Sequence, residues 1–160
     1  MKKRTVVCHD MSGKLYKVNA DKLFVRVSVY GVLIEKGKIL LLKQKFGYDF
    51  PGGGMELHEK LKECLEREFW EETGLKVKQQ ELLFAANSFY YLKFRKKFAN
   101  NILLYYRCKK VSGKLSTKNF DEKEKLYAIG PEWISVKDLK KITFQNGINS
   151  LALIKQALKK

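Results

Sequence analysis

The sequence has few of the features that mark secreted or membrane proteins. Its three cysteines, Cys8, Cys64 and Cys108, are far apart and odd in number, so they suggest neither a disulfide framework nor a C-x-x-C pair. We expect them to be free thiols in a reducing compartment. The apolar run after the first basic residues is too short for a signal peptide, and no segment approaches the roughly 18 apolar residues of a membrane span. These absences predict a soluble, cytoplasmic protein.

Acidic residues are also scarce. The 17 Asp and Glu residues are outnumbered by 33 Lys and Arg residues, which gives a net charge of +16. Such a charge could attract polyanionic substrates or RNA. The lysines are scattered along the whole chain instead of forming one block, so composition alone is the other explanation. Both explanations stay open at this point.

Linkers, repeats and low-complexity stretches are missing as well, so we expect one domain over residues 1–160. Residues 1–22 are predicted to form an N-terminal hairpin extension, with strands at 5–8 and 15–18. The hydrophobic pattern predicts further strands at residues 23–34, 39–45, 75–86, 88–94, 98–111 and 126–136, and helices at 59–73 and 147–160. Several strands with one central and one late helix indicate a mixed α/β fold.

Residues 46–57 are predicted to be a loop because Gly52, Gly53 and Gly54 are consecutive. Three glycines fit poorly in a helix or a central strand. Since no side chain intervenes, their backbone can approach a ligand or a metal closely. Gly74 stands where a glycine would cap the C-terminus of the following helix.

The scarce acids gather in that helix, where Glu68, Glu71 and Glu72 are close neighbours. Like charges at spacings of three and four residues repel each other. At about 100° per residue, Glu68 and Glu72 lie near the centre of the apolar stripe, and Glu71 lies at its edge. Partly buried carboxylates need a compensating charge, and carboxylate oxygens suit a hard ion such as Mg²⁺, which also binds phosphates.

Together, the glycine loop and the acidic helix match the pattern G-x5-E-x7-R-E-U-x-E-E-x-G-U, where U is a bulky aliphatic or aromatic residue. The matching residues are Gly53, Glu59, Arg67, Glu68, Phe69, Glu71, Glu72, Gly74 and Leu75. This segment, residues 53–75, resembles the Nudix box of the MutT/Nudix hydrolases. The segments at 39–44, 51–56 and 132–139 also resemble the family. The resemblance implies a Nudix-type α/β/α sandwich with a central mixed sheet, and hydrolysis of a nucleoside diphosphate linked to another group.

By this resemblance, Glu68, Glu71 and Glu72 hold Mg²⁺ or Mn²⁺, helped by the backbone carbonyl of Gly53. The metal would neutralise and polarise the diphosphate while a metal-bound water attacks phosphorus. Glu68 is the candidate for deprotonating or orienting that water, although the general base differs among members of the family. Glu72 belongs to the same predicted catalytic set.

Arg67 and Glu59 complete that set, with a structural role. Eight residues of straight helix span about 12 Å. The two side chains can therefore pair only if Glu59 lies in the loop, as it does in the family. A pair between Arg67 and Glu63, one helical turn apart, is the local alternative.

Five more residues are candidates for the substrate site or for completing the metal site. Gly52 and Gly54 would let a phosphate approach the backbone. Lys43 could meet a phosphate, as basic residues do at this place in relatives, or it could be a surface lysine. A late acid often completes such sites in the family, and Glu122 and Glu124 are the candidates. A solvated charged loop is the alternative for these two.

The substrate is only weakly indicated. The only prolines are Pro51 and Pro131, and the lack of one about 15 residues after the box counts against the ADP-ribose specialists. Tyr91 resembles a tyrosine of dinucleoside polyphosphate hydrolases, although its aromatic segment could equally be a packed strand. We expect a Mg²⁺-dependent pyrophosphohydrolase, monomeric or homodimeric, that acts on a nucleoside triphosphate or a dinucleoside polyphosphate. An RNA 5′-end pyrophosphohydrolase and a non-catalytic nucleotide-binding module are the alternatives.

Overall fold

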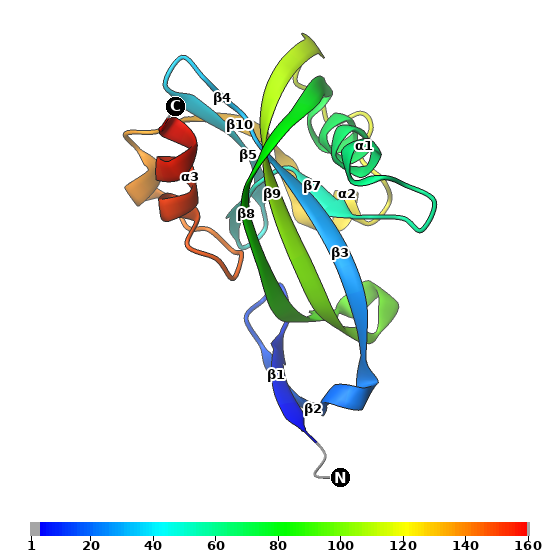
Figure 1. Cartoon of the computed structure of the whole chain (residues 1–160). Coiled ribbons are helices and arrows are strands. Elements are labelled where there is room, and N and C mark those ends of the chain that lie inside the picture. The colour runs from blue at the N-terminus through cyan, green and yellow to red at the C-terminus, as the bar shows by residue number, and fades with distance from the viewer. Residues whose placement is uncertain (1–3, 160) are drawn as a thin grey trace.

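The computed structural model describes residues 4–159, which form two sheets and three α-helices (Figure 1). The helices are α1 (Leu61–Thr73), α2 (Glu124–Tyr127) and α3 (Ser150–Leu158). The strands are β1 (Thr5–His9), β2 (Leu15–Asn19), β3 (Leu23–Val32), β4 (Ile34–Glu35), β5 (Lys38–Gln44), β6 (Gly47–Asp49), β7 (Gly52–Gly54), β8 (Leu75–Leu92), β9 (Lys97–Gly113) and β10 (Ala128–Ser135).

The larger sheet is mixed, as predicted. Its strand order is β2-β1-β8-β9-β3-β7, while the smaller sheet has the order β10-β5-β4 with β6 paired to β5. β3 runs parallel to β9 along its whole length, whereas β8 and β9 form a long antiparallel pair. The predicted N-terminal hairpin is present as β1 and β2, and its β1 strand touches the end of β8.

α1 and α3 cover opposite faces of the larger sheet (Figure 1). Because side chains alternate along a strand, β3 supplies both cores. Val29 packs with Leu65 and Phe69 of α1, whereas Val32 packs with Ile154 of α3. This arrangement is the predicted α/β/α sandwich, and it holds α1 firmly against the sheet.

The glycines at 52–54 form strand β7 instead of the predicted loop. Gly52, Gly53 and Gly54 pair with Tyr30, Val29 and Ser28 of β3 in antiparallel register. The expectation of a loop was wrong because β7 is an edge strand, where glycine is tolerated, and not a central one. β7 and β3 are so close that a side chain at Gly52 would overlap the β3 backbone, so this position requires glycine.

Other boundaries differ from the prediction in ways that have local causes. Residues 75–92 are one strand, since Asn87 lies between the two predicted segments and still pairs with Ile102. α2 replaces the start of the strand predicted from residue 126, because the Asp121 carboxylate accepts hydrogen bonds from the backbone N–H groups of Lys123 and Glu124.

The three cysteines are buried free thiols. Of the helices formed by residues 4–159, none is long and apolar enough to span a bilayer.

Candidate active site

The site is built on α1, which presents its acids toward the sheet. The helix ends at Gly74, whose φ of 75° is a left-handed conformation that favours glycine. Phe69 is fully buried in the core and sets the rotation of the helix. Glu72 is therefore only 3% exposed, and the side chains of Glu68 and Glu71 are 12% and 28% exposed. The burial follows the apolar stripe expected from helical geometry.

Three carboxylates converge at this place. Oxygen atoms of Glu68, Glu71 and Glu124 all lie within 4.8 Å of one another. Glu124 comes from α2 and is 5% exposed. Its neighbour Glu122 points away, since its exposed carboxylate pairs with Lys125. Of the two late acids predicted as candidates, the structure brings only Glu124 to the glutamates of α1.

Glu72 lies beside this cluster without joining it. Its carboxylate accepts a hydrogen bond from the backbone N–H of Gly52 at 2.8 Å, which ties α1 to β7. Burial, followed by the charge of Glu68, raises the pKa of Glu72 well above its ordinary value. Gly53 is close to Glu68, because a Cβ on Gly53 would stand 2.6 Å from that carboxylate. The glycine strand thus forms one wall of the acidic site.

The cluster has the electrostatic character of a cation site. Burial raises the pKa of Glu68 to about 7, and the charges of Glu71 and Glu124 add to the rise while Arg67 opposes it. Burial also raises the pKa of Glu124. Hard divalent ions prefer carboxylate oxygens, and such an ion would offset the repulsion among these groups. The donor set therefore fits Mg²⁺ or Mn²⁺.

Arg67 links the acids to the turn before α1. Its guanidinium binds the carboxylate of Glu59 through Nε and through Nη2, the latter at 2.9 Å. Its Nη1 donates to Glu68 at 2.9 Å and to Glu71 at 3.0 Å. The hydrogen bond from Arg67 lowers the pKa of Glu59 to about 2. The pair with Glu59 is thus formed, whereas Glu63 caps the backbone N–H of residue 60 and does not pair with Arg67.

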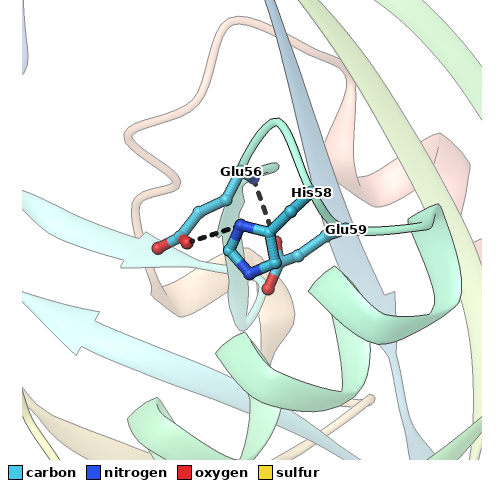
Figure 2. Close-up of side chains that lie close together, drawn as sticks. All are labelled: Glu56, His58 and Glu59. Atoms are coloured by element: carbon cyan, nitrogen blue, oxygen red, sulfur yellow. Dashed lines mark hydrogen bonds and ion pairs between the residues drawn. The ribbon is translucent and has the colours of Figure 1, made fainter.

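A second acidic group lies in the same turn but has a different character. Glu56, His58 and Glu59 gather there, with the His58 Nδ1 3.5 Å from the Glu56 carboxylate (Figure 2). The side chains of His58 and Glu56 are 79% and 57% exposed. Because two of its three side chains are mostly exposed to solvent, this group is a weaker candidate for a metal than the buried cluster.

Lys43 forms an ion pair with a residue of β10 and not with the acids of α1. Its Nζ lies 3.5 Å from the carboxylate of Glu132 on the neighbouring strand β10, and both side chains are about two-fifths exposed. The charge of Glu132 raises the pKa of Lys43. The ammonium is thus occupied by a surface pair.

Tyr91 is packed at the hairpin end of the sheet. Its ring centroid lies 4.8 Å from that of Tyr16 in β2 and 4.7 Å from that of Phe98 in β9. Through β3 and β9, Gly53 is level with Ala85, so Tyr91 stands six residues (91 − 85) further along β8. The structure does not bring Tyr91 to the glutamates, and the packed-strand alternative describes it better.

Two residues near the site were not anticipated from the sequence. Tyr127 of α2 lies beside the acids, where burial and the charges of Glu72 and Glu124 raise its pKa. The resemblance pointed to the acids of this segment, but no sequence signal singled out Tyr127. Arg26 packs against Gly54 from β3. The sequence did carry a signal for Arg26, because it is the one charged residue in the largely apolar run at 23–34.

Comparison with known proteins identifies the family of this chain. The model of the NUDIX domain matches residues 22–152. A MutT-like protein from Streptomyces ambofaciens is 32% identical over 90 residues, which cover 54% of this chain and 53% of that protein. The chain thus spans about half the length of this relative.

Solved structures agree in fold. The MutT protein from Methanosarcina mazei superimposes with a TM-score of 0.62 at 22% identity, covering 87% of this chain and 99% of that one. An ADP-ribose pyrophosphatase from Streptococcus suis gives a TM-score of 0.61 at 18% identity, covering 86% and 94%. Such low identities show the fold alone. The family model, by contrast, covers most of the chain, and the protein therefore belongs to the NUDIX domain family.

Proposed function

We propose that this protein is a Nudix hydrolase, a divalent-metal-dependent pyrophosphohydrolase that cleaves a nucleoside diphosphate linked to another group. The observation that carries the proposal is the convergence of Glu68 and Glu71 with Glu124 from a distant segment, all with little exposure to solvent. Like-charged groups gathered without a function would cost stability, because burial disfavours each ionised carboxylate.

Glu68, Glu71 and Glu124 would hold Mg²⁺ or Mn²⁺, with Glu72 and the carbonyl of Gly53 beside them. When bound, such an ion neutralises and polarises the diphosphate. Glu68 is our candidate for accepting the proton of the attacking water, since it lies against the glycine strand that a phosphate can approach. Arg67 would hold Glu68 and Glu71 in their orientation.

A nucleoside triphosphate is the first substrate to test. The packing of Tyr91 between Tyr16 and Phe98 removes the one residue that favoured a dinucleoside polyphosphate. The similarity in fold to an ADP-ribose pyrophosphatase is a reason to include nucleotide sugars and ADP-ribose as well.

The experiment measures phosphate, pyrophosphate or nucleotide release from a panel of nucleoside triphosphates, dinucleoside polyphosphates, ADP-ribose, nucleotide sugars and 5′-triphosphorylated RNA. Each is assayed with Mg²⁺, with Mn²⁺ and with EDTA. Glu68→Gln should lower turnover by about 10²- to 10⁴-fold if Glu68 is a general base. Glu66→Gln is the matched control, because Glu66 is on the same helix and pairs at the surface with Lys62. A folded wild type that turns over no member of the panel would contradict the proposal.

A further inference from the structure

Arg26 lies on the opposite side of β7 from the glutamates. Successive side chains of a strand point to opposite faces. A Cβ on Gly53 would meet the carboxylate of Glu68, whereas a Cβ on Gly54 would meet the guanidinium of Arg26. The bare glycine strand is thus flanked by negative charge on one side and by positive charge on the other.

Buried polar groups hold the Arg26 side chain in place. Its Nη1 donates to the hydroxyl of Ser28 at 2.7 Å, and that hydroxyl donates to Asn101 Oδ1 at 2.9 Å. Ser28 is 0% exposed and Asn101 is 5% exposed. Polar groups buried this deeply in a sheet are expected to form hydrogen bonds with each other, and here these bonds also orient the guanidinium.

The guanidinium nevertheless keeps most of its hydrogen-bonding capacity. It has five N–H donors, and the bond to Ser28 uses one of them. Arg67 and Arg107 are each paired with a carboxylate. For Arg26, no carboxylate within residues 4–159 is close enough to form an ion pair. A half-buried arginine without an anionic partner is suited to an anion that arrives with a ligand.

Two tyrosines lie in the neighbourhood of Arg26. Burial raises the pKa of the Tyr90 hydroxyl to about 12, and the nearby charge of Arg26 opposes that rise. Burial also raises the pKa of Tyr30, and the charge of Arg26 again opposes the rise. The Tyr90 ring also meets His9 of the hairpin edge-on, with centroids 5.2 Å apart. Tyr30 and Tyr90 are therefore close enough to Arg26 for its charge to act on their hydroxyls.

We propose that Arg26 is a phosphate-binding residue of the substrate site. On the assumption that the proposed function is correct, the phosphate chain of a nucleoside di- or triphosphate crosses β7. One part lies at the glutamates, and another is bound by the planar fork of Arg26. Arginine binds phosphate through two parallel N–H groups. Because Gly53 and Gly54 carry no side chains, the Glu68 carboxylate and the Arg26 guanidinium both come close to the β7 backbone, one on each side of the strand. This assigns recognition of the phosphates to a residue of β3, outside the glycine-rich motif.

The first test is independent of catalysis. Binding of inorganic pyrophosphate in EDTA is measured by calorimetry for the wild type, Arg26→Gln, Arg26→Lys and Arg95→Gln. Arg95→Gln is the matched control, because it removes the same charge from an exposed residue in the turn between β8 and β9. We expect Arg26→Gln to weaken binding by about 10-fold or more. Arg26→Lys should give an intermediate loss, and Arg95→Gln should change little. Equal binding by wild type and Arg26→Gln, or no binding by the wild type, would overturn the inference.

The second test uses the substrate class that the wild type hydrolyses. Arg26→Gln should lower kcat/KM by about 10- to 100-fold while Arg95→Gln stays close to the wild type. If the wild type is active and Arg26→Gln is equally active, this inference fails and the proposed function stands. If the wild type hydrolyses nothing, the proposed function fails, and pyrophosphate binding alone decides the role of Arg26. Thermal unfolding of each variant verifies that it is folded. If Arg26→Gln does not fold, the comparison of Arg26→Lys with the wild type decides the test.

Discussion

Replacing Arg67 with methionine should destabilise the protein by several kcal/mol. Methionine has a similar length and helix propensity, so the change mainly removes the charge and the hydrogen bonds. Arg67 binds Glu59, Glu68 and Glu71, and its loss leaves all three carboxylates without this partner. The side chain of Glu59 is only 7% exposed, so solvent compensates little for the lost contact.

Two lines of reasoning give the same magnitude. The pKa of Glu59 falls from its ordinary 4.5 to about 2, and at 1.36 kcal/mol per unit this shift corresponds to roughly 3 kcal/mol. Removing one partner of a buried pair costs about 3–5 kcal/mol in general. Because the folded pKa is depressed, the contribution of Glu59 is present above pH 4.5 and is lost as the pH falls toward 2. In Arg67→Met, this part of the acid dependence should disappear.

The assay is urea unfolding in EDTA, followed by tryptophan fluorescence at neutral pH and at several acidic pH values. Lys62→Met is the control, because Lys62 pairs with Glu66 at 3.5 Å on the exposed side of the same helix. That variant should lose less than about 1 kcal/mol. If Arg67→Met loses no more than Lys62→Met, the reasoning about the buried pair is refuted.

Three further predictions concern the site and its surroundings. Gly53→Ala places a methyl carbon 2.6 Å from the Glu68 carboxylate. Turnover should fall about 100-fold while the urea midpoint changes little, since that carboxylate ends a flexible side chain; full activity would contradict this. Asp49 has a pKa raised by burial to about 6, so its stabilising contribution is complete below pH 3.8 and is lost as the pH rises through 6. Asp49→Asn should therefore be more stable than the wild type above pH 6, by up to about 3 kcal/mol in urea unfolding, and equal stability at pH 8 would refute it. Glu124→Gln should weaken Mn²⁺ binding about tenfold or more in a spectroscopic titration, whereas its exposed neighbour variant Glu122→Gln should not; equal affinities would show that Glu124 is no ligand.

The sequence alone determined the local features of the site. A helix turns by about 100° per residue, so the placement of Glu68 and Glu72 on the apolar side followed from the positions of the core residues. Their low exposure in the structure agrees with that geometry. The cap at Gly74 depends on one residue's conformation. For Arg67 the sequence left two nearby partners, Glu59 and Glu63, and the structure shows the pair with Glu59. Each of these inferences concerns residues that are close in the chain.

Only the tertiary structure decided which distant groups meet those residues. Glu124 reaches the glutamates of α1 because the chain returns after the whole of β8 and β9. The glycines became an edge strand because β3 offered them backbone partners. Tyr91 packs against the N-terminal hairpin, and Arg26 lies beside the glycine strand. Both placements follow from the register of the sheet, which fixes which side chains of neighbouring strands lie next to each other on the same face. Register and chain return depend on contacts between remote segments, and no local periodicity encodes them.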